Sequence, residues 1–545
     1  MEDPMHFIMS RRASMLTGLA GGLLLGMPTR LWAQAAPSAV VETGAGKVRG
    51  RRIGGVSTFL GIPYGADTAQ YRFLPPRAPK PWAGVRECVA LGHQAPQMAL
   101  GAGERSGPHP DMNSNFVRQV IAAGTQGMEV GNEGEDCLVL NVYTPEASPM
   151  RRRPVMVWFH GGGFSIGSAG DPQYDGKALA RRGDVVVVGI NHRLNALGFL
   201  DLGAISSDYI DACNVGMLDL VFALQWVRDN IANFGGDPGN VTIFGESGGG
   251  SKVSFTLALP AAHGLFHKAI IQSGAALTGL EKEKAASHAE RTLAALGTTD
   301  VHKLPAMDYR QILTAAHAAQ GRDQNLLRPT IDGRTFPRDP FTPGAPEVSR
   351  DVPIMIGTTK TEETLFMSAD PLFGKMDEAT ARQRAARQLG AKADQAYDLV
   401  KAIHPDWSPT CVLAGIATAN NAWIRSITLA ERKLAQQSAP VFMYRLDWEA
   451  PFANGALKSP HGLDTDLVFD NPETKSLMNG TGPAPRKVAA AMSQAWIDFA
   501  RNGDPSQAAL PWPRYDTASR RTMIFNVDSR VVSDPDKPLR ELLSS

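Results

Sequence analysis

The sequence contains few cysteines, and their spacing limits the chemistry that they can support. Only four occur in 545 residues, and no two of them form a C-x-x-C pair: Cys88, Cys137, Cys213 and Cys411. A disulfide scaffold needs a higher density of cysteine, and structural zinc sites usually contain closely spaced cysteine pairs. We therefore expect isolated buried thiols, no metal site and no disulfide framework.

The chain also lacks an excess of charge of either sign. Its 55 lysines and arginines nearly balance its 54 aspartates and glutamates. A protein that binds nucleic acid through the phosphates usually has a surplus of basic residues. The balance therefore argues against nucleic acid as a partner and is typical of an ordinary globular protein.

Long hydrophobic runs are missing as well. The apolar stretch from Met15 to Met27 is shorter than the roughly 20 residues that a membrane-spanning helix needs. We find no other segment that is long and apolar enough to cross a bilayer. The sequence therefore predicts no stable membrane insertion.

Residues 1–35 are instead typical of an export signal. The pair Arg11-Arg12 precedes the apolar stretch, and Ala33-Gln34-Ala35 forms a small-x-small site that fits cleavage after its last residue. The arginine pair resembles a twin-arginine signal, with the Sec route as the alternative, and Met9 is an alternative start. We expect an exported protein that is periplasmic or secreted after cleavage.

Beyond the signal, short apolar runs alternate with longer segments of helical periodicity. Strands are expected within residues 153–163, 184–194, 240–247, 266–274, 352–359 and 440–448, and helices within 217–231 and 249–259. This alternation predicts an α/β protein with a mostly parallel central sheet and helices on both faces. In such sheets the reactive groups lie at the carboxyl ends of the strands.

Two stretches interrupt the alternation. Residues 98–134 are polar and glycine-rich, which predicts a long loop with a functional or mobile character. Residues 275–350 combine helices with loops and look like an insertion between two strands. Because no segment has the composition of a linker, we expect residues 36–545 to form a single catalytic domain.

The most informative short motif is Gly245-Glu246-Ser247-Gly248-Gly249, which fits G-x-S-x-G. In this motif the serine lies on a strained turn between a strand and a helix, and the flanking glycines are needed because strand and helix crowd together there. An apolar β-rich run precedes the motif and a helical segment follows it. The context therefore favours Ser247 as a nucleophile over a plain glycine turn.

A serine hydroxyl needs a general base, and the base needs an acid that orients it. In this architecture the acid and then the histidine follow the serine along the chain. Glu362 and Glu363 both follow an expected strand, while His404 and His461 are the only downstream histidines. His404 resembles a helix end, whereas His461 lies in a glycine-containing loop after the last expected strand, so His461 is the better base.

The oxyanion of the reaction needs N–H donors. The run His160 to Phe164, HGGGF, follows an expected strand, and its three glycines let backbone amides approach one point closely. We predict that Gly162 and Gly163, together with the amide of Gly248, form an oxyanion hole with three donors.

These motifs and several longer blocks resemble the type-B carboxylesterase family, which includes the cholinesterases. The blocks occur in family order over nearly the whole mature chain: FLGIPYG, YRFLPP, GEDCLVLNVYTP, PVMVWFHGGGF, NHRLNALGFL, NVGMLDLVFALQWVRDNIANFGGDPGNVTIFGESGGGS and AWIDFARNGDP. The resemblance implies an α/β-hydrolase fold and hydrolysis of carboxylic esters without a cofactor. It implies Ser247 as nucleophile, Glu362 as acid and His461 as base.

The same resemblance implies oxyanion donors at the three glycines named above and two structural ion pairs, Arg72 with Glu135 and Arg193 with Asp219. The chain departs from the family at three places. Glu363 stands where glycine is usual after the acid, and Ala95 stands where a cysteine pairs with the Cys137 position, which leaves Cys88 as the only nearby partner. Residues 117–136 contain no aromatic residue, which argues against a cholinesterase.

We therefore predict a serine carboxylic-ester hydrolase that forms an acyl-enzyme on a small-molecule ester. One alternative is an interfacial lipase in which residues 98–134 act as a lid. A second is a non-catalytic binding protein, because some relatives of this kind have lost the serine. The intact set of Ser247, Glu362 and His461 argues against the second alternative.

Overall fold

The computed structural model describes residues 36–98, 115–124 and 132–545, except for positions 322 and 324. The predicted export signal and most of the predicted 98–134 loop lie outside these described residues. The described residues group into one compact unit.

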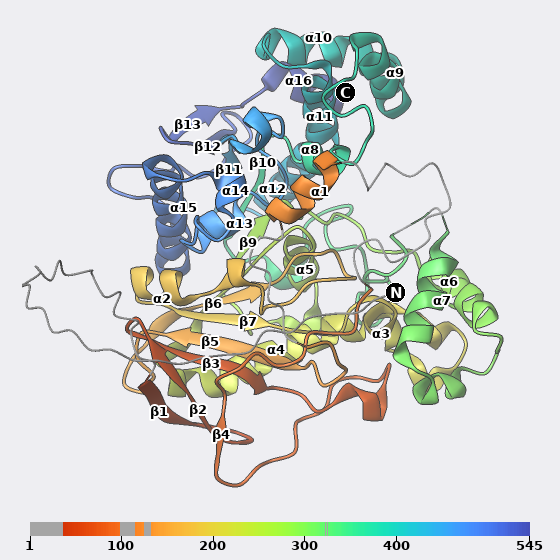
Figure 1. Ribbon diagram of the computed structural model, residues 1–545, viewed down its shortest axis with the longest axis vertical. Helices are drawn as coiled ribbons and strands as arrows, with labels where there is room; N and C mark the ends of the chain where they lie inside the picture. Colours follow the sequence, from red (N-terminus) through yellow and green to blue (C-terminus); the bar gives the residue numbers. More distant parts are fainter. Residues whose placement is uncertain (1–35, 99–114, 125–131, 322, 324) are drawn as a thin grey trace, which may run out of the picture. The chain divides into compact units, whose positions relative to one another are not determined.

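A single large sheet organises the described residues (Figure 1). Its strands are β1 (Ala36–Thr43), β2 (Gly46–Ile53), β3 (Val56–Pro63), β4 (Val85–Glu87), β5 (Val139–Thr144), β6 (Arg153–Phe159), β7 (Val186–Ile190), β8 (Gly236–Glu246), β9 (Lys268–Gln272), β10 (Ile354–Thr359), β11 (Val441–Leu446), β12 (Arg521–Phe525) and β13 (Arg530–Ser533). The spatial order is β1-β2-β3-β5-β7-β6-β8-β9-β10-β11-β12-β13, and β4 pairs with β2.

The middle of the sheet is parallel. Strands from β7 through β6, β8, β9, β10 and β11 to β12 pair in parallel, whereas β1, β2, β3, β5 and β13 add antiparallel pairs at the two ends. Every residue of β6, β7, β10 and β11 is buried, as expected for strands covered on both faces. The predicted mostly parallel sheet is confirmed.

Helices cover the sheet and extend from it. They are α1 (Asn115–Gly124), α2 (Lys177–Gly183), α3 (Asn195–Phe199), α4 (Val215–Asn230), α5 (Gly248–Thr256), α6 (Lys282–Ala295), α7 (Tyr309–Gln320), α8 (Glu363–Met367), α9 (Glu378–Leu389), α10 (Ala393–Ile403), α11 (Pro409–Thr418), α12 (Ile424–Leu434), α13 (Thr465–Val468), α14 (Ser476–Asn479), α15 (Pro483–Asn502) and α16 (Lys537–Ser544). Between β9 and β10 the described chain forms α6 and α7 with long connections, as the predicted insertion requires.

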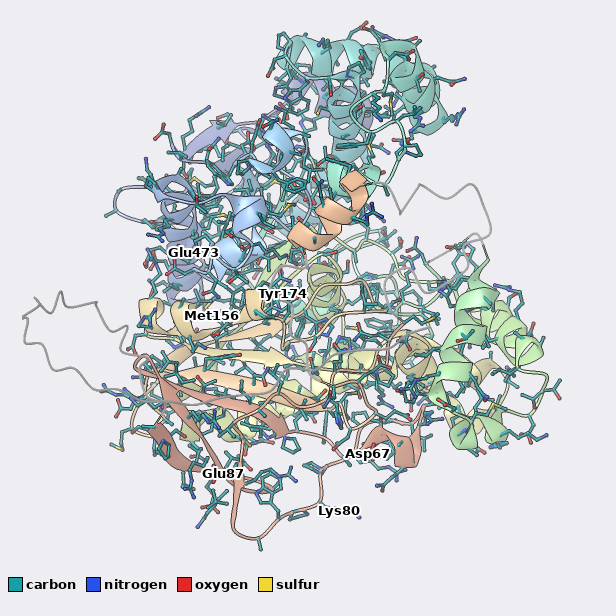
Figure 2. The ribbon with its side chains drawn as sticks, viewed as in Figure 1. Asp67, Lys80, Glu87, Met156, Tyr174 and Glu473 are labelled. Atoms are coloured by element: carbon teal, nitrogen blue, oxygen red, sulfur yellow. The ribbon has the colours of Figure 1, made fainter. Side chains whose placement is uncertain are left out.

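Alternating residues of the central strands build two cores. Val157 of β6 joins a core with α4, whereas its neighbours Met156 and Trp158 join a core with α2 and α15 on the other face. Figure 2 shows Met156 inside the fold, while Lys80 and Glu87 lie at its lower edge. Successive side chains of a strand point to opposite faces of the sheet, and each face packs against its own helices. Helices therefore cover both faces, as predicted.

One part of the predicted 98–134 loop is helical. Helix α1 places Phe116, Val120 and Ala123 at helical spacing, and the last two are buried. The ring of Phe116 stacks on that of Phe373 with a centroid distance of 5.3 Å. The loop prediction is therefore wrong for these residues, because their short apolar period was masked by the glycine-rich sequence around it.

The expectation that no further segment could cross a membrane by length and composition is also wrong. Within the described ranges, Ser207–Phe234 is long and apolar enough, and it contains α4. Its apolar window is 72% buried inside the fold. The apolar character of this segment reflects a core helix that packs on the sheet.

All four cysteines are buried free thiols, as predicted. Both ion pairs implied by the family resemblance form. Arg72 Nε donates to Glu135 Oε2 over 2.7 Å, and Arg193 Nη2 lies 2.6 Å from Asp219 Oδ1 with both side chains buried.

Candidate active site

Ser247 occupies the turn between β8 and α5. Its φ of 58° and ψ of −122° are strained for a residue with a side chain. A Cβ on Gly245 would lie 2.5 Å from the carbonyl carbon of Gly249, and one on Gly249 would lie 2.0 Å from the carbonyl oxygen of Phe159. Only glycine fits at both positions, so the close packing of β8, β6 and α5 imposes the backbone that exposes Ser247.

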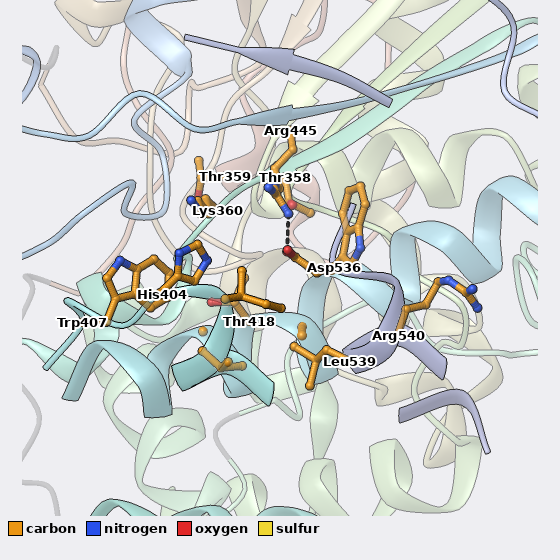
Figure 3. Close-up of a pocket in the computed structure, with 15 residues that line it drawn as sticks. Thr358, Thr359, Lys360, His404, Trp407, Thr418, Arg445, Asp536, Leu539 and Arg540 are labelled. Atoms are coloured by element: carbon orange, nitrogen blue, oxygen red, sulfur yellow. Dashed lines mark hydrogen bonds and ion pairs between the residues drawn. The ribbon is translucent and has the colours of Figure 1, made fainter. Parts of the chain in front are cut away.

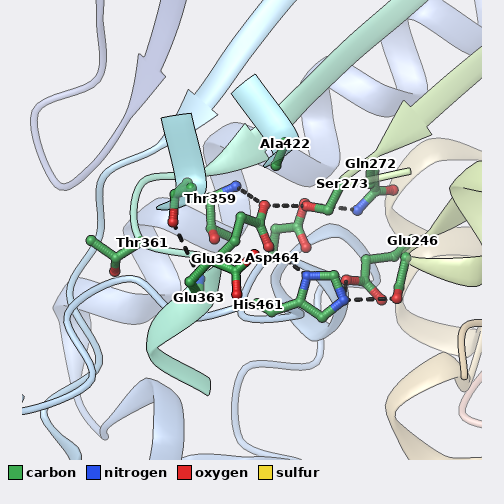
Figure 4. Close-up of polar contacts among 12 residues, drawn as sticks. Glu246, Gln272, Ser273, Thr359, Thr361, Glu362, Glu363, Ala422, His461 and Asp464 are labelled. Atoms are coloured by element: carbon green, nitrogen blue, oxygen red, sulfur yellow. Dashed lines mark hydrogen bonds and ion pairs between the residues drawn. The ribbon is translucent and has the colours of Figure 1, made fainter. Parts of the chain in front are cut away.

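His461 lies in the loop that follows β11, and it bridges Ser247 to Glu362. Its Nε2 is 2.7 Å from Ser247 Oγ. Its Nδ1 is 2.5 Å from Glu362 Oε2, a contact that Figure 4 shows. The bond to the carboxylate fixes the tautomer with the proton on Nδ1 and leaves Nε2 free to accept from the serine. The three residues selected from the sequence therefore form one hydrogen-bonded chain.

Glu362 is held rigidly after β10. Its carboxylate is buried, and Oε1 accepts from the Thr359 N–H over 2.7 Å and from the Ser273 hydroxyl over 2.6 Å. These bonds leave Oε2 for His461. Sequence reasoning missed Ser273, although it directly follows β9, at the sheet edge where reactive groups gather.

Glu363 faces elsewhere. Its Oε1 accepts from Asn421 Nδ2 over 3.1 Å, and its N–H donates to Thr418 Oγ1 over 3.2 Å. Thr418 is the last residue of α11, and Asn421 lies in the helical turn that follows it, so neither contact is made with the site of Ser247. The choice of Glu362 over Glu363 thus agrees with the geometry.

The site also contains a second buried carboxylate close to the base. Glu246 Oε1 lies 3.3 Å from His461 Nε2, and this oxygen has no hydrogen-bond partner in the described residues. Burial raises the pKa of Glu246. Burial alone would lower the pKa of His461, but Glu246 and Glu362 outweigh it and raise that pKa above its ordinary value.

Asp464 completes this acidic environment and was not selected from the sequence. Its Oδ2 accepts from Gln272 Nε2 over 3.0 Å and from the Tyr444 hydroxyl over 2.8 Å. Burial raises its pKa to about 6. The sequence places Asp464 three positions after His461, and that proximity is the only local signal for it.

The glycine loop after β6 lies against Ser247. Gly162 and Gly163 have φ values of 83° and 63°, which favour glycine. A Cβ on Gly248 would lie 2.4 Å from the nitrogen of Gly163, so the two backbones meet beside the serine. The three predicted oxyanion donors are thus gathered at one place.

His404 lies away from the serine, as the prediction of a helix end requires. It caps α10 at its C-terminus, and its ring stacks on Trp407 with a centroid distance of 3.9 Å. Both rings line a pocket at the end of β10 and β11, which Lys360 and Arg445 also line (Figure 3). Burial lowers the pKa of His404 to about 4.

No cluster of three or more histidine, cysteine, aspartate or glutamate side chains suited to a metal ion occurs in the part of the chain that the structure describes.

Comparison with known proteins places the chain among esterases. Residues 37–538 match the profile of the carboxylesterase family. The para-nitrobenzyl esterase of Bacillus subtilis (strain 168) is 34% identical over 92% of this chain and 98% of its own length. The fumonisin B1 esterase of Sphingopyxis macrogoltabida is 33% identical over 91% of this chain and 88% of its own.

The crystal structure of a Geobacillus stearothermophilus carboxylesterase superposes with a TM-score of 0.77 at 35% identity, covering 92% of this chain and 99% of that one. An esterase from Clostridium hathewayi that hydrolyses aliphatic aromatic polyesters gives a TM-score of 0.76 at 30% identity, over 93% and 98% of the two chains. The fold is the α/β-hydrolase fold, and the protein is a serine carboxylic-ester hydrolase that uses a Ser-His-Glu triad. The chain belongs to the carboxylesterase family.

Proposed function

We propose that Ser247 attacks the ester carbonyl while His461 accepts its proton. The main support for these two roles is the 2.7 Å contact between Ser247 Oγ and His461 Nε2 at the strained turn. His461 then protonates the leaving alcohol, and water repeats the sequence on the acyl-enzyme. Glu362 keeps the imidazole in the productive tautomer and stabilises its cation.

The amides of Gly162, Gly163 and Gly248 are the proposed donors to the oxyanion of the tetrahedral intermediate. Support comes from their convergence beside Ser247 and from the position of Gly248 at the first turn of α5, where backbone N–H groups lack intrahelical acceptors. Such donors act on charge that develops in the transition state and therefore raise kcat.

We propose a small-molecule ester as the substrate, in preference to a lipid interface. The names of the relatives concern chemically different esters, including para-nitrobenzyl esters, fumonisin B1 and polyesters. Phe116 of α1 packs on Phe373 and Phe452. Because the apolar face of α1 is covered by these rings, it is not an exposed patch of the kind that binds a lipid interface. This packing favours a helix fixed on the surface over an interfacial lid.

A panel of p-nitrophenyl esters from acetate to palmitate tests this proposal, with each ester assayed below and above the concentration at which it forms an emulsion. We expect kcat/KM to be highest for short acyl chains and to show no jump at the emulsion threshold. A preference for palmitate together with a rise of activity at the interface would instead support the lipase alternative.

We also propose that the chain is exported and cleaved after Ala35. The support is the sequence pattern of Arg11-Arg12, an apolar stretch and a small-x-small site. N-terminal sequencing of the protein recovered from the periplasm or medium should give Ala36 as the first residue. Recovery of the uncleaved chain from the cytosol alone would contradict the proposal.

A further inference from the structure

A buried lysine behind the glycine loop has no part in the mechanism above. Lys252 belongs to α5, and its side chain is completely buried. Its Nζ forms no ion pair with a carboxylate of the described residues. Burying a cation without a counter-ion is costly, so its position calls for a compensating role.

Lys252 contacts both ends of the glycine loop. Its Nζ donates to the backbone carbonyl oxygen of His160 over 2.9 Å. The same nitrogen lies 5.6 Å from the ring centroid of Phe164, within the range of a cation–π contact. His160 and Phe164 flank the glycines that carry the proposed oxyanion donors. The side chain of Lys252 therefore contacts the glycine loop at both of its ends.

Two histidines of the described residues lie close enough to Lys252 for its charge to act on them. The rings of His160 and His192 stack with a centroid distance of 5.1 Å, and both are buried. Burial, followed by the charge of Lys252, lowers the pKa of each well below its ordinary value, so both are neutral near pH 7. Lys252 therefore supplies the positive charge on this side of the loop.

We propose that Lys252 is a positioning residue of the oxyanion hole, which fixes the loop of Gly162 and Gly163 and places a positive charge behind the developing oxyanion. This inference rests on the proposed role of that loop. The oxyanion forms in the transition state, so an interaction with it affects kcat more than KM.

The charge of Lys252 gives the proposal a pH signature. Burial lowers the pKa of Lys252 to about 7. Below that pH the folded protein carries the cation and bears the full cost of burying it. As pH rises, the folded protein loses the cation, and the support of the oxyanion weakens. The wild-type kcat should therefore decline above pH 7.

The test compares Lys252→Met and Lys252→Gln with a matched control, Lys433→Met. Lys433 is likewise buried and donates to the backbone carbonyl of Arg350 over 2.8 Å, but it lies outside the site. At pH 6.5 we expect both Lys252 variants to lose about 10- to 100-fold in kcat, less than a direct donor would cost, with KM changed by less than about threefold. The deficit should narrow toward pH 9, and the control should keep the wild-type kcat and pH profile.

Two further readouts separate positioning from a general structural defect. Removing a buried unpaired cation should leave the melting temperature at pH 6.5 unchanged or higher in Lys252→Met. A trifluoromethyl ketone, which forms an oxyanion on the serine, should bind more weakly by the same factor as kcat falls. A kcat deficit that is equal at all pH values, or shared by Lys433→Met, would overturn the inference.

The same experiment distinguishes this inference from the proposed function. A fluorophosphonate that fails to label Ser247 in the wild-type enzyme would reject the proposed function itself. Labelling of Ser247 together with wild-type kcat and inhibitor affinity in Lys252→Met would reject only the role of Lys252.

Discussion

Replacing Glu362 by glutamine should nearly abolish hydrolysis while preserving the fold. Oε1 of Glu362 accepts from Thr359 N–H and Ser273 Oγ, so the side-chain oxygen of glutamine should keep that position. Its NH₂ group would then point at His461 Nδ1, where the carboxylate now lies at 2.5 Å. His461 would have to accept at Nδ1 and carry its proton on Nε2, so it could no longer accept the proton of Ser247.

The magnitude follows from the loss of both functions of the acid. The wrong tautomer removes the base, and the imidazolium loses its counter-charge. In related triads this substitution costs about 10⁴ in kcat, which is about 5.4 kcal/mol of activation free energy. Because glutamine has the shape of glutamate and keeps two of the three hydrogen bonds, the melting temperature should change little.

The assay is kcat on p-nitrophenyl acetate, with Glu363→Gln as the matched control and circular dichroism as the check on folding. Glu363 contacts Asn421 and not His461, so the kcat of its variant should stay close to that of the wild type. Its stability should change by no more than about 0.5 kcal/mol. Equal losses in both variants, or a loss confined to Glu363→Gln, would refute the assignment of Glu362.

Three further predictions concern the general base, the carboxylate beside it and the cysteines. His461→Ala should lose several orders of magnitude in kcat, as much as a change at the nucleophile, whereas His404→Ala should keep a kcat near that of the wild type. The reverse ranking would show that His461 is not the general base. Glu246→Gln removes a charge that raises the pKa of His461, so the acid limb of the kcat/KM profile should move to lower pH, and an unmoved or upward-shifted limb would contradict this. Thiol titration of the denatured, unreduced protein should count four free thiols, and a count of two would reveal a disulfide among Cys88, Cys137, Cys213 and Cys411.

Local sequence patterns predicted the parts of the site that are built by continuous segments. Ser247 and the glycine loop each follow a β-rich run. Their glycines predicted a close approach of backbone segments, and the structure confirms that approach at Gly245 and Gly249. His461 and Glu362 required the chain order of the fold and the resemblance to a family as well. The parallel sheet was predictable because its strands are fully buried and read as continuous apolar runs.

The residues that the sequence did not reveal act through contacts between distant segments. Ser273 reaches Glu362 only because β9 and β10 are neighbours in the sheet. Lys252 reaches His160 only because α5 packs on the end of β6. Helix α1 was missed for another reason. Its apolar residues, such as Phe116 and Val120, repeat at helical spacing over too short a segment to be recognised among glycine-rich surroundings.

The central claim is that Ser247 forms the acyl-enzyme, and peptide mapping by mass spectrometry tests it most directly. The enzyme is treated with a fluorophosphonate until hydrolysis stops, and the modified residue is then located. We expect one adduct per chain on Ser247, and we expect the rate of labelling to fall strongly in His461→Ala. Complete inactivation with the adduct on a different serine, or full hydrolytic activity in a chain labelled at Ser247, would contradict it.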